Sequence, residues 1–224
     1  MKNLTALIIL IALIGGLSQA RGQAQFQGPA DQSIRFGVKA GLGQAGFTGS
    51  DARGAGHSER LGWTAGAFAT IPVYQTLSLQ PEWIISRKGS EVLVQPDPEE
   101  ISIYNLRIDL LYTDIPVLLR WDVNPGTTVN ANFIGGGYGG YLLQAQQTLE
   151  DEGGESEDIP DIMNDFNFGF IIGFGMEYAF EQLGGVFLDL RLTNGLRDIM
   201  DEDASEDSPN YRTSLLSVSA GIRF

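Results

Sequence analysis

The chain contains a single histidine, which is followed directly by a serine and a glutamate at His57, Ser58 and Glu59. Histidine, serine and an acid are the side chains with which hydrolases and acyltransferases build a general base and a nucleophile. Three adjacent residues cannot all point at one reacting atom, so the serine would have to come from another segment. The candidates for it are Ser86, Ser102 and Ser214. We expect no enzyme, and an enzyme that acts through His57 is the alternative.

Two acidic stretches, 146–165 and 195–210, are the candidates for metal binding because together they hold 14 of the 28 acidic residues. Carboxylates are ligands that Ca²⁺ and Mg²⁺ prefer. The second stretch has the first spacings of an EF-hand loop from Asp201, but Glu206 replaces its glycine and Arg212 its final glutamate, so an EF-hand is excluded. What remains is an interpretation as solvated acidic loops, with loose Ca²⁺ or Mg²⁺ binding as the alternative. The candidate ligands are Asp151, Glu152, Asp201, Asp203 and Asp207.

Composition and context exclude other cofactors and nucleic acids. The chain has no cysteine, one histidine and a net charge of −14, which excludes disulfides and Cys-ligated metals and provides no basic surface for nucleic acid. Gly41, Gly43 and Gly46 match the G-x-G-x-x-G pattern of a dinucleotide site. That site needs a helix after the glycines, and residues 48–60 show no helical apolar stripe. We therefore expect no cofactor and no nucleic-acid partner.

The amino terminus predicts export from the cytoplasm. Lys2 precedes an apolar run over 4–17, which is too short for a spanning helix and typical of a secretory signal peptide. Small residues allow cleavage after Ala20, Gly22 or Ala24. We assign 1–22 to the signal peptide and 23–33 to a short periplasmic segment. No cysteine follows the apolar run, which excludes a lipid-anchored lipoprotein.

The rest of the chain alternates between large apolar residues and small or polar ones. From Phe166 to Phe180 every even position is large and apolar, whereas the odd positions are mostly glycine or polar. This period of two indicates a strand longer than the about 9 to 11 residues that a tilted strand needs to cross a bilayer. The same pattern predicts eight strands, at 34–47, 62–73, 77–88, 104–121, 128–144, 166–180, 185–194 and 211–224. A change of phase near 112–114 predicts a bulge in the fourth strand.

Short and long connections alternate between these strands. Turns near 74–76, 122–126 and 181–184 alternate with polar segments near 48–61, 89–103, 146–165 and 195–210. Short periplasmic turns and longer outside loops are the layout of an outer-membrane barrel. The sequence therefore predicts an all-β fold over 34–224: an eight-stranded antiparallel transmembrane up-and-down β-barrel in the outer membrane of a Gram-negative bacterium, with both termini periplasmic. A soluble β-sandwich or lipocalin-like barrel is the alternative fold.

The interior of an eight-stranded barrel is only wide enough for side chains to fill. Glycine, at 29 of 224 residues, would make room there for large polar groups. Buried charges must pair, because an isolated one carries a large desolvation penalty. We expect a plugged network of ion pairs that stabilises the barrel, with an ion-conducting path as the alternative. Alternation places these charged residues inside: Arg35, Lys39, Glu82, Lys88, Arg107, Asp109, Asp114, Arg120, Glu177, Asp189, Arg191 and Arg223.

Several motifs resemble those of a known family. They are GVKAGLG (37–43), LSLQPEWIISRKG (77–89), LLYTDIPVLLR (110–120), GGGYGGYLL (135–143) and SVSAGIRF (217–224). Together they look like the outer-membrane β-barrel family that includes PorT-like proteins, similar in architecture to small OmpA- and OmpX-type barrels. The resemblance covers about 33–224 and implies no shared catalytic residues. The terminal Phe224 matches the aromatic that barrels present to the barrel assembly machinery, so this machinery and periplasmic chaperones are implied as transient partners.

Pattern and resemblance together predict a monomeric, non-enzymatic outer-membrane barrel with an envelope-structural role or a role in interactions through its loops. The expected partners are outer-membrane lipid and lipopolysaccharide, together with secretion-system or envelope proteins. If the acidic loops bind divalent cations, these cations would bridge the loops to lipopolysaccharide. An accessory component of a protein-secretion system, as PorT-like members are, is one alternative. An enzyme that modifies lipids at the barrel rim is the other.

Overall fold

The structure, a computed structural model, describes residues 33–48, 58–94, 104–149, 156–158, 163–180, 184–199 and 211–224. No helix in these ranges is long and apolar enough to cross a membrane. The predicted signal peptide, and all but the last residue of the predicted segment 23–33, lie outside them. The strands are β1 (Arg35–Thr48), β2 (Ser58–Tyr74), β3 (Leu77–Val94), β4 (Tyr104–Asp122), β5 (Val129–Leu149), β6 (Ser156–Asp158), β7 (Phe166–Phe180), β8 (Gly184–Gly195) and β9 (Arg212–Arg223).

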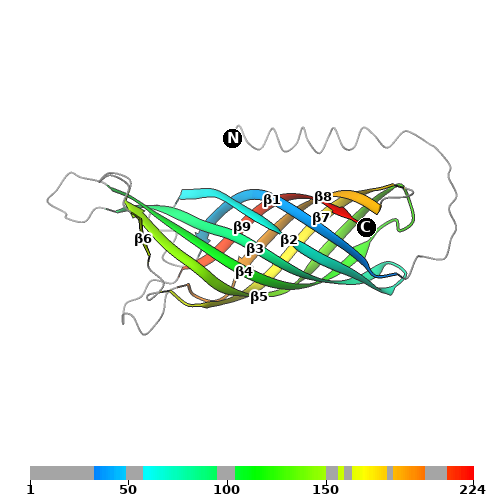
Figure 1. The fold of residues 1–224 in the computed structure, drawn as a ribbon, viewed down its shortest axis with the longest axis horizontal. Helices are drawn as coiled ribbons and strands as arrows, with labels where there is room; N and C mark the ends of the chain where they lie inside the picture. Colours follow the sequence, from blue (N-terminus) through cyan, green and yellow to red (C-terminus); the bar gives the residue numbers. More distant parts are fainter. Residues whose placement is uncertain are drawn as a thin grey trace.

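Eight of the described strands close into an antiparallel barrel (Figure 1). Their order is β4-β3-β2-β1-β9-β8-β7-β5, and a further pairing of β4 with β5 closes the ring, while the three-residue β6 pairs with β5. The first and last strands are neighbours: the Phe36 amide donates to the Phe224 carbonyl over 3.0 Å, and the Phe224 amide donates back over 2.9 Å. The closed ring confirms the predicted eight-stranded antiparallel barrel.

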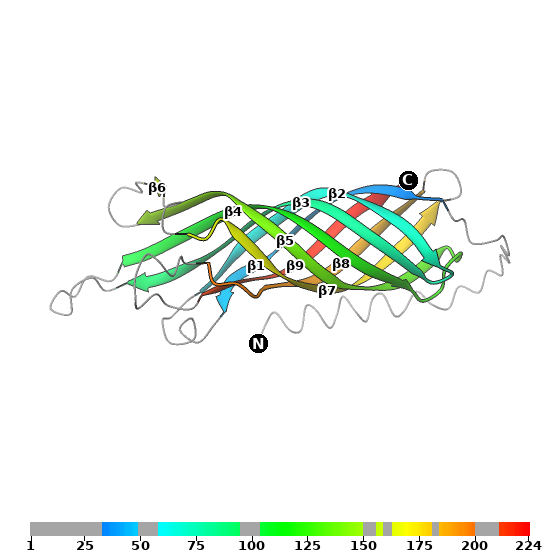
Figure 2. The ribbon, with the colours of Figure 1, turned by 90° about the horizontal axis from the view of Figure 1, so that it is seen from below.

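The strands run between two ends of the barrel (Figure 2), and these ends differ in the number of residues that connect the strands. Residues 75–76, 123–128 and 181–183 connect strands at the end where β9 finishes, which we call the turn end. Residues 49–57, 95–103, 150–165 and 196–211 connect strands at the opposite end, which we call the loop end. The barrel strands between them have 12 to 21 residues, compared with about 5 to 6 in ordinary soluble sheets.

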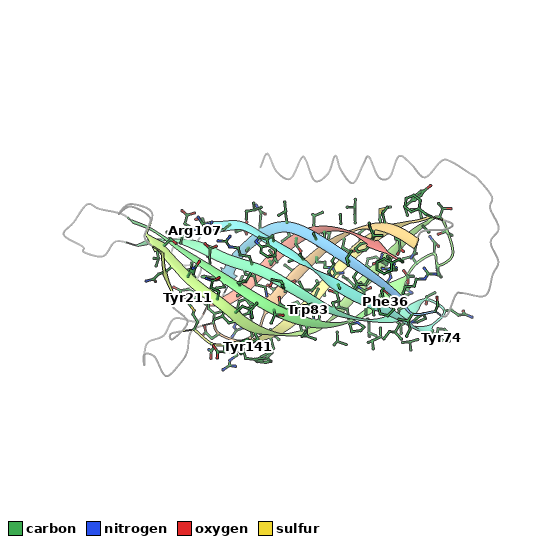
Figure 3. All side chains as sticks on the ribbon, viewed as in Figure 1. Phe36, Tyr74, Trp83, Arg107, Tyr141 and Tyr211 are labelled. Carbon is green, nitrogen blue, oxygen red and sulfur yellow. The ribbon has the colours of Figure 1, made fainter. Side chains whose placement is uncertain are left out.

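The outer wall is apolar and exposed. Large apolar side chains on the outward phase of their strands are about half exposed, among them Val117, Phe168 and Leu188. Phe36 and Trp83, which Figure 3 labels, are two more. The inward phase of the same strands carries buried charged and polar side chains. A soluble sandwich or lipocalin-like barrel would have the opposite arrangement, so the alternative fold is excluded. An apolar exterior around a polar interior is the arrangement of a barrel surrounded by lipid.

Strand β4 departs from the prediction. Its even-numbered residues from Ile108 to Arg120 point into the barrel without a change of phase. The bulge lies on the partner strand β5, at Leu143. Arg107 and Asp109 therefore lie on the outer face of β4, and their predicted position in the lumen is wrong. The reason is that the extra residue which shifts the phase belongs to the neighbouring strand, so β4 itself continues to alternate.

Arg35 also differs from its predicted position. It shares the inward phase of β1 with the buried Lys39, but it is the first residue of that strand and is exposed at the turn end. Alternation gives the face on which a residue lies, whereas the depth depends on where the strand enters the barrel. Arg35 is therefore not part of the buried lumen.

Candidate functional site: the charged lumen

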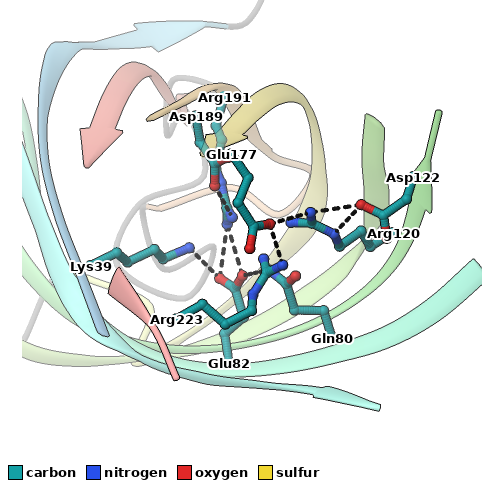
Figure 4. A network of polar contacts seen from close by, with 9 residues as sticks. All are labelled: Lys39, Gln80, Glu82, Arg120, Asp122, Glu177, Asp189, Arg191 and Arg223. Carbon is teal, nitrogen blue, oxygen red and sulfur yellow. Dashed lines mark hydrogen bonds and ion pairs between the residues drawn. The ribbon is translucent and has the colours of Figure 1, made fainter. Parts of the chain in front are cut away.

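The lumen near the turn end contains a layer of ion pairs, which we call the lower layer (Figure 4). Arg120 on β4 contacts Asp122 at 2.7 Å and Glu177 on β7 at 2.8 Å. Glu177 also accepts a hydrogen bond from Arg223 on β9. The Arg223 guanidinium lies 5.5 Å from the centroid of the Phe68 ring, which is itself buried. Ion pairs in this layer thus connect β4, β7 and β9 across the interior.

A second layer, the middle layer, is centred on Glu82 of β3 (Figure 4). Lys39 on β1 donates to Glu82 Oε2 over 2.6 Å, and Arg191 Nη1 on β8 contacts both carboxylate oxygens at 3.0 and 2.9 Å. Gln80 Nε2 donates to Oε1 over 2.7 Å. Arg191 also pairs with Asp189 at 2.7 Å. One carboxylate therefore joins three strands that are separated in the sequence by 43 and 109 residues.

The third layer, the upper layer, lies closer to the loop end. Lys88 pairs with Asp114 at 3.0 Å, and Ser86 donates to the same carboxylate over 2.6 Å. The ammonium of Lys88 lies 4.9 Å from the ring centroids of both Tyr112 and Tyr138. A cation over aromatic faces gains electrostatic attraction from the ring quadrupoles. Lys88 is thus held by one carboxylate and two rings.

An apolar cluster fills the barrel above the upper layer. Its members come from the inward phase of β1, β4 and β5, joined by Met163 and by Ile199 before β9. The Asn164 amide donates to the Ile199 carbonyl over 2.8 Å, which joins the two loop-end segments. The buried residues of this loop-end cluster are Phe47, Ile108, Leu110, Tyr112, Leu142, Ala145, Met163 and Ile199.

The charges in the three layers are balanced. The five cationic side chains are Lys39, Lys88, Arg120, Arg191 and Arg223, and the five anionic ones are Glu82, Asp114, Asp122, Glu177 and Asp189. Replacing a buried pair by apolar residues is often neutral, but removing one partner leaves an uncompensated charge that costs about 3–5 kcal/mol. The network therefore selects the strand arrangement in which every one of these charges has a partner.

A cavity of about 30 Å³ lies between the middle and upper layers, with Lys39, Glu82, Lys88, Asp114 and Arg191 in its lining. The Asp114 Oδ1 atom is buried and accepts no hydrogen bond from the described residues. Since a single water needs about 10–15 Å³ of such volume, the cavity has room for about two waters. The described residues thus leave space for isolated water here, between two layers of paired charge.

Glycines provide the space for the charged side chains at two positions. A Cβ atom on Gly140 would collide with the Asp114 carboxylate. A Cβ atom on Gly175 would collide with the Asp189 carboxylate and with the Asn132 amide. All three polar residues are buried. A narrow barrel can hold large polar side chains only where the facing residues are small. This accounts for part of the glycine excess.

The serines of the alternative enzyme lie on different faces of the wall. Ser86 points into the lumen and is buried, whereas Ser214 lies on the outward phase of β9. Gly41, Gly43 and Gly46 lie within the extended strand β1, where no helix follows the glycines in the described ranges. Of the remaining candidates, Ser58 and Glu59 are exposed at the start of β2, and His57 and Ser102 lie outside the described residues.

The predicted metal ligands Asp151, Glu152, Asp201, Asp203 and Asp207 all lie outside the described residues. Within the described ranges, no group of three or more His, Cys, Asp and Glu side chains is placed to hold a metal ion.

Sequence reasoning missed Asp122, which it placed in a turn. Asp122 is the last residue of β4 and accepts a hydrogen bond from Arg120 Nε over 2.9 Å. Asp122 could have been found from its spacing of two residues from Arg120, because residues i and i+2 of a strand share a face. The same spacing pairs Arg191 with Asp189.

Comparison with known proteins gives one family and several solved barrels. Residues 23–201 match the family described as outer membrane protein beta-barrel domain. No curated protein matches the chain. A major outer membrane protein from Thermus thermophilus is 13% identical, with a TM-score of 0.51, and the match covers 86% of this chain and 100% of that one. At this identity the likeness shows the fold alone.

Two further barrels are similar at lower scores. Neisserial surface protein A is 15% identical with a TM-score of 0.45, covering 84% of this chain and 97% of that one. OprG from Pseudomonas aeruginosa is 12% identical with a TM-score of 0.46, covering 85% of this chain and 94% of that one. The family match covers most of the chain, and the closed barrel with an apolar wall agrees with it. The chain belongs to the outer membrane protein beta-barrel domain family.

Proposed function

We propose that this protein is a non-conducting, non-enzymatic outer-membrane anchor that stabilises the envelope and displays its loop end outside the cell. The observation that carries the proposal is the filled lumen. Three layers of paired charge and the loop-end cluster succeed one another along the barrel axis. A solute would have to displace all of them.

The energy of displacement supports a closed barrel. Separating a buried ion pair leaves each partner with a desolvation cost of several kcal/mol, and the three layers present this cost in succession. Apart from the Tyr112 hydroxyl, the buried side chains that form the loop-end cluster are apolar, so an ion would find few ligands among them. Both arguments favour a barrel whose interior supplies stability.

The lengths of the connections support the proposed orientation. Outer-membrane barrels have short periplasmic turns and longer outside loops. We therefore place the turn end, with the carboxyl terminus, in the periplasm, and the loop end outside a Gram-negative cell. The exposed loop end is then the part available for interactions.

Conductance in a planar bilayer tests the closed lumen. We expect the reconstituted protein to give no current steps above the protein-free bilayer, while a general porin does. The matched variants are Lys39→Met in the lumen and Trp83→Phe on the lipid-facing wall. Steps that change in Lys39→Met and persist in Trp83→Phe would establish an ion path through the lumen and overturn the proposal.

Cysteine labelling tests the orientation, because the natural chain has no cysteine. Glu59→Cys at the loop end and Pro125→Cys at the turn end both replace exposed residues. A membrane-impermeant maleimide should label Glu59→Cys in intact cells and Pro125→Cys only after the outer membrane is permeabilised. The reverse pattern would contradict the proposed orientation.

A further inference from the structure

Three arginines share one carboxylate on the outer face of the barrel. Asp109 on β4 contacts Arg60 Nη1 at 3.0 Å, Arg87 Nη2 at 3.1 Å and Arg107 Nε at 2.8 Å. These arginines come from β2, β3 and β4, which are consecutive strands of the wall. We call the four residues the arginine cluster. The sequence analysis placed Arg107 and Asp109 in the lumen, where ion pairs were expected. Charged side chains on the outer face of a barrel need a different explanation.

The arginine cluster lies where the apolar wall ends. The outward residues of β4 from Trp121 to Leu111 are apolar, except for Thr113, whose hydroxyl accepts a hydrogen bond from Trp83. Ten residue steps of about 3.3 Å, tilted by about 40°, span about 25 Å, which is the height of the apolar band on outer-membrane barrels. The next outward residues of β4 are Asp109 and Arg107. The cluster is therefore at the depth of lipid headgroups.

The arginine cluster carries a surplus of positive charge. Within its four residues three guanidinium groups share the one carboxylate of Asp109, and the acidic Glu91 lies opposite Arg107 on β3. The Arg87 and Arg107 side chains are 39% and 32% exposed. Each guanidinium has five N–H donors in a planar fork that matches phosphate oxygens, and the contacts with Asp109 engage one nitrogen of each. This surplus stands out on a chain whose net charge is −14.

We propose that the arginine cluster binds the phosphate group of an anionic lipid in the leaflet at the loop end. In the proposed orientation, on which this assignment rests, that lipid is the phosphorylated glycolipid of the outer leaflet. Arg87 and Arg107 donate to its phosphate, and its acyl chains lie on the apolar wall directly below, beside Trp63 and Leu111. These two residues are the cross-strand neighbours of Arg87 on that face. The arginine cluster is continuous with the apolar wall, so a lipid would contact both. Free phosphate would contact the arginines alone, and the continuity therefore favours a lipid.

Binding of purified lipid A to the full barrel in nanodiscs, measured by native mass spectrometry, tests the assignment. The test variant is Arg87→Gln with Arg107→Gln. The matched control is Arg35→Gln with Arg197→Gln, which removes the same charge from two exposed arginines elsewhere. We expect bisphosphorylated lipid A to bind about tenfold or more weakly to the test variant, and the control to bind as the natural chain does. Single Arg107→Gln replaces the double variant if the latter does not fold.

Three results would overturn the proposal: equal binding by test variant and natural chain, equal binding of dephosphorylated lipid A, or full displacement of lipid A by inorganic phosphate. The last would assign the cluster to free phosphate. The two proposals can also fail separately. If the cysteine labelling is reversed but lipid binding still depends on the phosphate, the orientation and the outer-leaflet lipid are refuted, whereas the arginine cluster remains a site for a lipid headgroup. Failure of the proposed function and failure of the lipid site are therefore separable.

Discussion

Replacing Glu82 by glutamine removes the charge at the centre of the middle layer while keeping the size of the side chain. Lys39 then loses the carboxylate at 2.6 Å, and Arg191 loses its contacts with both oxygens. Arg191 keeps Asp189 at 2.7 Å, so most of the cost falls on Lys39, whose side chain is only 3% exposed.

The expected loss of unfolding free energy is about 3–4 kcal/mol, the lower part of the range for a buried charge that loses its partner. Denaturant unfolding of the barrel in lipid vesicles, followed by tryptophan fluorescence, measures it. The three tryptophans of the chain are retained in the variant. Glu59→Gln removes an exposed carboxylate and should change the same free energy by less than about 0.5 kcal/mol.

A double variant separates an unpaired charge from lost packing. Lys39→Met combined with Glu82→Gln removes both members of the pair, and it should be less destabilised than the sum of the two single variants by about 1–3 kcal/mol. An effect of Glu82→Gln below about 1 kcal/mol, or strict additivity in the double variant, would refute the reasoning that the layer is held by paired charge.

Two other predictions use the same unfolding assay. Gly66→Ala should destabilise the barrel by about 1–3 kcal/mol, because the new Cβ atom would collide with the Trp83 carbonyl. Gly137→Ala should be nearly neutral, because its Cβ atom would lie 3.6 Å from the nearest atom. Equal effects of the two substitutions would contradict this reasoning. Trp83→Phe should cost about 0.5–1.5 kcal/mol, because it removes the 2.9 Å hydrogen bond from Nε1 to Thr113 Oγ1. A Thr113→Val variant that loses nothing would show that this hydrogen bond contributes nothing.

Alternation in the sequence was sufficient to predict eight strands, their two faces and the exposed apolar wall. The segment from Phe166 to Phe180 was predicted with the bounds that β7 has in the structure. Nine of the twelve charges predicted inside are buried there, among them Lys39, Glu82 and Arg191. Strand ends were less predictable, since β2, β3 and β5 extend further toward the loop end than their apolar pattern does.

The tertiary structure alone decided which charges meet and which leave the lumen. Glu82 pairs with Arg191, 109 residues away, because closure of the ring brings β3 and β8 to opposite sides of one narrow interior. Arg107 and Asp109 lie outside because the bulge is in β5, at Leu143, so that β4 alternates without interruption. The physical reason is that alternation is a property of one strand, with a period fixed by its backbone, whereas pairing across the lumen depends on the register and closure of all eight strands together.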